Sequence, residues 1–246
     1  MALREELEAN GNWLFRKRSY LPVLFIPVFI LALRGYTYFF DSPEMQGIWV
    51  FFCLTTSYLG LGIRVWTIGH TPKGTSGRSN NKQTAECLNT TGMYSVVRNP
   101  LYLGNFFMGL GMALFAHSWW LVAIYTMAFW LYYERIILAE EAFLKSTFGQ
   151  TYLEWADRTP AFVPDLKKYK KPALPFSPRN VLRREYNGFF TILVVMSSLK
   201  AYGDLSYLGK LDFNLEWRVF MASGFAIWLI LRSLKRHTRI LKVEGR

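Results

Sequence analysis

The sequence predicts an all-α fold, a polytopic transmembrane helical bundle of about six helices with no Rossmann fold. Two observations lead to this prediction. The hydrophobic residues, 52% of the 246, are gathered into long runs with few charges, which is typical of membrane-spanning helices. The basic residues flank these runs, so the net charge of +12 indicates membrane boundaries, and no nucleic-acid partner is expected.

The first third of the chain predicts an amphipathic lead-in followed by a helical hairpin. Residues 1–19 are charged and polar, with acids before bases. The apolar run 20–40 predicts the first membrane helix, with Arg34 near its far end reaching the interface. A turn at 41–43 leads into a second predicted helix over 46–66.

The middle of the chain predicts a tight antiparallel pair of helices. Pro100 suits the first position of a helix over 100–116, because its missing N–H is not needed there. The short link at 117–118 makes the next helix, 119–137, an antiparallel neighbour, and we expect that helix to continue to Gly149. Close packing explains the small residues of the first helix: Gly104, Gly109 and Gly111.

The last third predicts a second hairpin behind a basic connector at 167–184. The apolar run 186–202 is short and contains polar residues, so a tilted or partly re-entrant helix stays open. A final helix is expected over 215–231, before a basic tail. We divide the chain into a lead-in with the first hairpin, a catalytic region with the middle pair, and a C-terminal hairpin with the tail: 1–66, 67–184 and 185–246.

The distribution of Lys and Arg predicts the orientation in the membrane. With six helices and both termini on one side, the basic segments face the cytoplasm, and four basic residues fall outside: Arg34, Lys200, Lys210 and Arg218. No cleavable signal peptide is expected. We therefore predict a multi-pass protein of the bacterial inner membrane with cytoplasmic termini. The oligomeric state is left open.

Cysteine and histidine usage predicts no disulfide framework and no metal site. Cys53 lies in an apolar run and Cys87 in a polar loop, and the three histidines are far apart in the sequence. The polar segment 70–99 is long enough to fold over a site.

Two stretches at the membrane boundary are expected to meet. Arg98 and Asn99 precede the third predicted helix, while Glu140 and Glu141 follow the fourth, so antiparallel pairing brings the four residues together. The N-terminus of a helix attracts anions, and a carboxylate suits an ammonium group or ribose hydroxyls. An interfacial site on the cytoplasmic side follows.

The two stretches read Gly92-x-Tyr94-x-x-Val97-Arg98-Asn99-Pro100-x-Tyr102-x-Gly104 and Glu140-Glu141 with Phe148-Gly149, Tyr152, Arg158 and Pro160. Together they resemble the integral-membrane methyltransferases of the isoprenylcysteine carboxyl methyltransferase and phospholipid methyltransferase superfamily. Among its members, the pattern is most similar to bacterial lipid A phosphate methyltransferases. Isoprenylcysteine enzymes typically have His where this chain has Asn99, which weakens the transfer of their substrate.

This resemblance implies an S-adenosylmethionine-dependent membrane enzyme. It implies cofactor contacts from Tyr94, Val97, Asn99, Pro100, Tyr102, Leu103, Gly104, Glu140 and Glu141, with Glu141 the preferred acid. Catalytic roles fall to Arg98, Glu141 and Arg158, and Arg158 would orient an acceptor oxyanion. Substrate contacts are expected from Arg78, Asn80, Tyr152 and Arg158.

For the acceptor, the basic connector and polar loop favour an anionic lipid headgroup, with a phosphate of lipid A preferred. A prenylcysteine carboxylate or the amine of phosphatidylethanolamine remains an alternative. A membrane scaffold or transporter is the alternative from another class, although transporters carry ionisable residues at mid-membrane.

Overall fold

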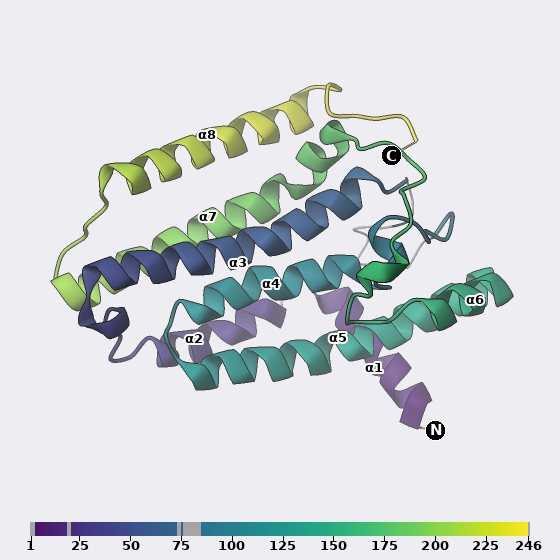
Figure 1. Ribbon diagram of the computed structural model, residues 1–246, viewed down its shortest axis with the longest axis horizontal. Coiled ribbons are helices and arrows are strands. Elements are labelled where there is room, and N and C mark those ends of the chain that lie inside the picture. Colours follow the sequence, from purple (N-terminus) through teal and green to yellow (C-terminus); the bar gives the residue numbers. More distant parts are fainter. Residues whose placement is uncertain (1–2, 19–20, 73–74, 76–84, 246) are drawn as a thin grey trace.

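The computed structural model describes residues 3–18, 21–72, 75 and 85–245, which form an elongated helical bundle (Figure 1). Within these residues there is no β-strand, and one isolated bridge joins Gly92 to Lys170. The predicted all-α fold without a Rossmann sheet is confirmed. The α-helices are α1 (Leu3–Lys17), α2 (Ile26–Ala32), α3 (Pro43–Gly69), α4 (Pro100–Leu114), α5 (Trp119–Phe148), α6 (Gln150–Arg158), α7 (Pro178–Leu208) and α8 (Leu215–His237).

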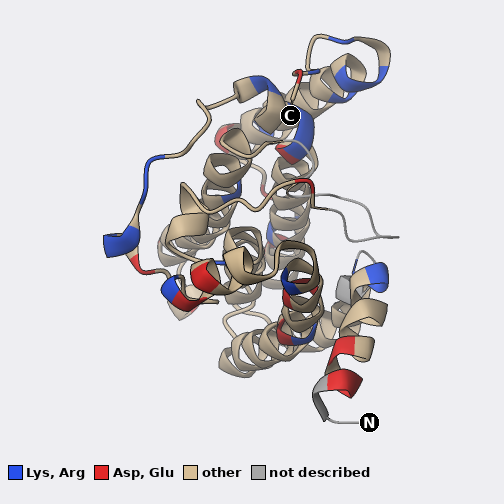
Figure 2. Cartoon of the chain, turned by 90° about the vertical axis from the view of Figure 1, so that its right-hand side faces the viewer, with Lys and Arg blue, Asp and Glu red and all other residues tan. Residues whose placement is uncertain are grey.

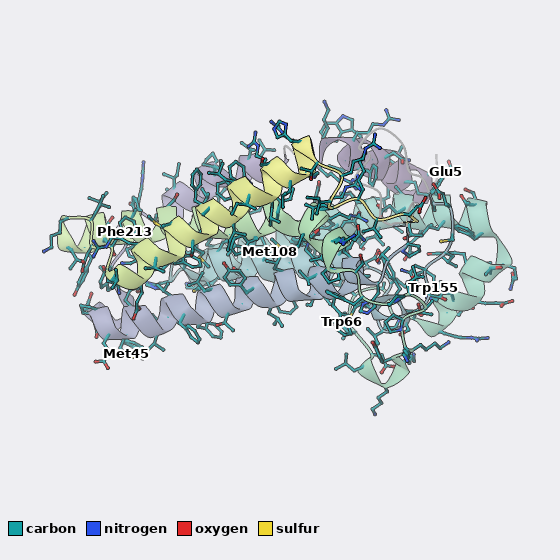
Figure 3. The ribbon with its side chains drawn as sticks, turned by 90° about the horizontal axis from the view of Figure 1, so that it is seen from above. Glu5, Met45, Trp66, Met108, Trp155 and Phe213 are labelled. Atoms are coloured by element: carbon teal, nitrogen blue, oxygen red, sulfur yellow. The ribbon has the colours of Figure 1, made fainter. Side chains whose placement is uncertain are left out.

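Four helices in the described part of the chain are long and apolar enough to cross a membrane: α3, α5, α7 and α8. The 27 residues of α3 extend for about 40 Å, more than the roughly 30 Å of a hydrocarbon core. The 15 residues of α4 reach only about 22 Å. The chain is therefore a multi-pass membrane protein. In Figure 3, Met45 and Phe213 mark one end of the helical bundle, and Trp66 and Trp155 lie toward the other end.

The first apolar run does not form the long helix predicted over 20–40. A 3-10 turn (Leu21–Phe25) leads into the seven residues of α2, and Gly35 then adopts a φ of 73°. The chain turns inward because two buried tyrosines find polar partners on other helices. Gln46 Nε2 donates to the Tyr36 hydroxyl at 2.7 Å, and the Tyr38 hydroxyl donates to Asp204 Oδ1 at 2.7 Å.

The predicted tight pair of helices is confirmed in α4 and α5. They are antiparallel neighbours, and the Tyr125 hydroxyl on α5 donates to the Phe106 carbonyl on α4 at 2.9 Å. Helix α5 ends where the sequence predicted, because Gly149 adopts a φ of 54° and its N–H donates to the Lys145 carbonyl at 2.9 Å.

Helix α7 is longer than the segment predicted at 186–202, and it is one continuous helix of 31 residues. The polar residues that interrupted its apolar pattern have partners in the fold. Lys200 pairs with Asp204 at 2.8 Å on the same helix, and Glu185 pairs with Arg64 on α3. A short or re-entrant helix is therefore excluded by the structure.

Helices α3 and α4 cross in close contact. A Cβ at Gly60 on α3 would overlap the Gly104 carbonyl oxygen and the Met108 amide nitrogen on α4. The expected packing role of the glycines in α4 is confirmed at Gly104, where an added Cβ would meet Gly60 and Arg64.

We expect Gly60→Leu to lower the free energy of unfolding by about 3 kcal/mol, because the two backbones must separate. Thermal unfolding in detergent measures the change. Gly62→Leu is the matched control, since no atom lies within 4 Å of a Cβ there. Equal effects of the two substitutions would contradict this packing.

Candidate functional site

The turn before α4 forms one wall of the site. Pro100 occupies the first turn of α4 and Asn99 is its N-cap residue, as the sequence predicted. The Asn99 side chain does not cap the helix, and its Nδ2 donates instead to the Ala161 carbonyl at 3.2 Å. The first N–H groups of α4, which have no partner within the helix, therefore lie directly beside the turn.

The segment that follows α6 holds this turn in place. The Arg98 N–H donates to the Pro160 carbonyl at 2.9 Å, and the Asp165 N–H donates to the Val96 carbonyl at 2.9 Å. The Trp155 indole donates to the Tyr94 carbonyl at 3.0 Å. Two stretches about 60 residues apart in sequence therefore form one rigid unit at this end of the bundle.

The two glutamates after the apolar part of α5 lie close to the turn and to the first residues of α4, as predicted. Glu141 Oε1 lies 3.2 Å from Arg98 Nη1, and the Tyr102 hydroxyl donates to Glu140 Oε1 at 2.9 Å. The acids thus have separate partners, one in the turn and one on α4. Acidic and basic residues occur together at this end of the bundle (Figure 2).

A cavity of about 440 Å³ lies between these elements and α1, α3 and α7. Among the residues that the structure describes, four arginines on different parts of the chain line it: Arg18, Arg64, Arg98 and Arg184. Its carboxylates are Glu140 and Glu185. Amide and aromatic groups complete the lining and include Asn89, Asn99, Asn105, Tyr94, Tyr102, Tyr133 and Trp155.

A polar network joins four helices at the cavity wall. Arg64 on α3 makes a two-pronged contact with Glu185 on α7, with Nε–Oε2 at 2.7 Å and Nη2–Oε1 at 2.9 Å. Its Nη1 donates to Asn105 Oδ1 on α4 at 2.7 Å, and Asn105 Nδ2 donates to the Tyr133 hydroxyl on α5 at 3.1 Å. Since the Glu185 side chain is 4% exposed, the pair is nearly dehydrated.

Two phenols outside the membrane-spanning segments stay protonated at neutral pH. Burial, followed by the charge of Glu140, raises the pKa of Tyr94 to about 12. Burial, followed by the charge of Glu141, raises the pKa of Tyr152. Both side chains can therefore donate hydrogen bonds, and neither is a base at neutral pH.

The structure brings about half of the sequence-predicted site residues to the cavity. Those lining it are Tyr94, Arg98, Asn99, Pro100, Tyr102 and Glu140. Val97 is fully buried behind the turn, and Gly104 lies at the α3–α4 crossing. Leu103, Glu141 and Tyr152 are not among the lining residues, and Tyr152 lies beside Glu141 and Arg98.

Arg158 lies apart from these groups. It is exposed at the last residue of α6 and does not line the cavity. Arg78 and Asn80 fall outside the residues that the structure describes.

Among the described residues, sequence reasoning missed four charged residues of the lining: Arg18, Arg64, Arg184 and Glu185. Arg64 lies near the end of the helix predicted over 46–66 and was not assigned to the site, and α3 continues to Gly69. A signal for its partner was present, because Glu185 is an acid directly after the basic pair Arg183 and Arg184. For Arg18 the sequence carried no signal, because its place depends on how α1 packs.

Comparisons with known proteins find relatives over part of the chain. Residues 47–151 match the family model described as phospholipid methyltransferase. A cobalt-zinc-cadmium resistance protein of Cupriavidus metallidurans, CzcN, is 35% identical over 147 residues, which cover 59% of this chain and 63% of that protein.

Isoprenylcysteine O-methyltransferases match a shorter stretch. That of Xenopus laevis is 33% identical over 91 residues, 37% of this chain and 32% of that protein. That of Tribolium castaneum is 30% identical over 89 residues, 36% of this chain and 32% of that protein.

No solved structure matches the chain. The alignments span less than two thirds of the length of these relatives. The matched region contains the turn, α4, both glutamates and the tight bend between α4 and α5. Over this region the chain is similar to the integral-membrane methyltransferases, which include the phospholipid and isoprenylcysteine methyltransferases.

Proposed function

We propose that this protein transfers a methyl group from S-adenosylmethionine to an anionic oxygen of a membrane-bound acceptor. The observation that carries the proposal is the cavity at one end of the bundle, which joins the Arg98 turn and Glu140 within the region matched by the family model. The cavity lies where membrane helices meet polar loops, so a lipid acceptor and a soluble cofactor both have access to it.

The residues of the cavity fit S-adenosylmethionine in size and chemistry. A volume of about 440 Å³ is within the usual range for small-molecule sites, roughly 300 to 1,000 Å³. Tyr94, Tyr102 and Trp155 offer aromatic surfaces to a sulfonium cation or an adenine ring. Arg98 also lines the cavity, and its guanidinium group can donate hydrogen bonds to an anion.

When bound, S-adenosylmethionine supplies an electrophilic methyl group on a positively charged sulfur. The protein would orient the reacting groups and exclude water from them. It would need no general base, because a carboxylate or phosphate acceptor is already ionised. Glu140 and the first turn of α4 would hold the cofactor. Arg98, kept in place by Glu141, would attract the acceptor anion.

The charges of the cavity favour an anionic acceptor over an amine. Four arginines and two glutamates from the described part of the chain line it. An amine acceptor such as phosphatidylethanolamine would need a base to remove its proton before it could accept the methyl group. Methylation of an oxygen anion is therefore the preferred reaction.

Two oxygen acceptors deserve direct comparison. The isoprenylcysteine O-methyltransferase relatives favour a prenylcysteine carboxylate. The basic connector before α7 favours a lipid phosphate, such as that of lipid A, but none of the relatives reported above is named for a lipid A enzyme. We place the carboxylate first and the phosphate second.

The proposed orientation puts the site and both termini in the cytoplasm of a bacterium, where S-adenosylmethionine is made. Arg158 would contribute only if the acceptor headgroup extends out of the cavity to the exposed end of α6.

A transporter or scaffold is less favoured, because the Arg64 and Glu185 charges at the cavity pair with each other.

We expect the purified protein in lipid nanodiscs to bind S-adenosylhomocysteine with a dissociation constant on the order of 1–100 μM. Isothermal titration calorimetry measures this binding. Transfer of a radiolabelled methyl group is then followed with a prenylcysteine analogue, lipid A or phosphatidylethanolamine in the disc.

Label on the prenylcysteine analogue or on lipid A identifies the oxygen acceptor. Label on phosphatidylethanolamine alone would overturn the anionic acceptor. A well-folded protein that binds neither S-adenosylhomocysteine nor S-adenosylmethionine would overturn the proposed function itself.

A further inference from the structure

The C-terminal end of α1 forms part of the cavity wall. Phe15 and Arg18 both line the cavity, although α1 precedes the region that matches the family model, residues 47–151. The helix lies beside α5 at the end of the bundle that contains the site (Figure 1). The N-terminal helix is therefore a component of this site.

The packing of α1 on α5 fixes its position relative to Glu140. A Cβ at Gly11 would overlap the carbonyl oxygen of Arg135 and would lie 3.0 Å from the Ala139 Cβ. Glycine thus lets the two helices touch at the residue next to Glu140. This contact leaves little freedom for α1 to slide along α5.

The Arg18 side chain is oriented by its neighbours. Its guanidinium carbon lies 4.1 Å from the centre of the Phe15 ring, and Phe15 is buried at 5% exposure. The positive charge of Arg18 acts on the Glu140 carboxylate. A cation from α1 and an anion from α5 therefore stand close together at the cavity.

Two of the other cavity arginines are engaged with carboxylates of their own. Arg64 is held by Glu185, and Arg98 by Glu141. Since Glu141 does not line the cavity, Glu140 is the carboxylate of the α5 pair that a ligand can reach. Arg18 and Glu140 both line the cavity, and the charge of Arg18 acts on Glu140, so this cation and this anion can act together on one ligand.

We propose that Arg18 and Glu140 form a receptor for the amino-acid end of the cofactor. That end carries an ammonium and a carboxylate on one carbon atom, so it needs an anion and a cation at short separation. Glu140 binds the ammonium and Arg18 binds the carboxylate through charge-assisted hydrogen bonds. This inference rests on the proposed function and adds a binding residue from outside the region matched by the family model.

The test compares two ligands that differ only at this end. S-adenosylhomocysteine contains the amino-acid group, and 5′-methylthioadenosine lacks it. We expect Arg18→Ala in nanodiscs to lower the affinity for S-adenosylhomocysteine about ten- to a hundredfold. The affinity for methylthioadenosine should change by less than about twofold. Calorimetry measures both affinities without any turnover. Arg16→Ala, which removes an exposed cation of the same helix, should change neither.

Two more variants keep the result interpretable. Arg18→Lys retains the charge and should lose less affinity than Arg18→Ala. Gly11→Leu should displace α1 from α5 and reproduce the selective loss.

An Arg18→Ala protein that binds S-adenosylhomocysteine as wild type does, or that loses both ligands equally, overturns the receptor while the proposed function stands. A wild-type protein that binds neither ligand overturns the proposed function as well.

Discussion

Replacing Glu141 with Gln is expected to reduce kcat about 100-fold while the protein remains folded. The substitution removes the negative charge that lies 3.2 Å from Arg98 Nη1, so Arg98 is no longer held over the cavity. A displacement of about 1 Å of a positioning group can cost this much in rate. Transfer of labelled methyl at saturating cofactor measures the change.

The role of Glu141 is to position Arg98, so the conservative variant is informative. Glu141→Asp keeps the charge and should recover part of the lost rate. Glu134→Gln is the control, because Glu134 is an exposed acid two turns earlier on α5. A normal kcat for Glu141→Gln, or equal loss in the control, would show that the ion pair has no part in turnover.

Glu185→Ala is expected to lower the free energy of unfolding by about 3–5 kcal/mol. The side chains of Glu185 and Arg64 are 4% and 15% exposed, so removing the acid leaves a poorly hydrated guanidinium without its two-pronged partner. The contact of Arg64 with Asn105 would not replace it. Thermal unfolding of the detergent-solubilised protein measures this loss.

Glu154→Ala, which removes an exposed acid on α6, should unfold as the wild type does. Replacing both partners together, with Arg64→Met and Glu185→Leu, should be milder than Glu185→Ala, because no buried charge is left alone. If Glu185→Ala unfolds at the wild-type temperature, α3 and α7 are held together by other contacts.

The features predicted correctly from the sequence are those set by local chemistry. Pro100 can begin a helix and Gly149 can end one because of their own backbone preferences. The short link before Trp119 leaves antiparallel pairing as the natural arrangement of α4 and α5. The meeting of Arg98 with Glu141 follows from these local facts.

The features that sequence reasoning missed depend on partners far along the chain. Tyr38 draws the first apolar run into a turn because Asp204, 166 positions later, accepts its hydrogen bond. Helix α7 extends through Glu185 because Arg64 neutralises it. Neither pairing leaves a periodic signal in its own segment, so hydropathy alone could not place the helix boundaries.

The segment after α6 also determines when the site is completed during synthesis. The Gly92 N–H bonds to Lys170, the Ser177 N–H bonds to the last residue of α3, and Glu185 comes later still. A nascent chain that ends before α7 can insert its earlier helices, but its cavity lacks the wall that α7 forms. The cavity is therefore complete only after α7 has been synthesised and has packed against α3.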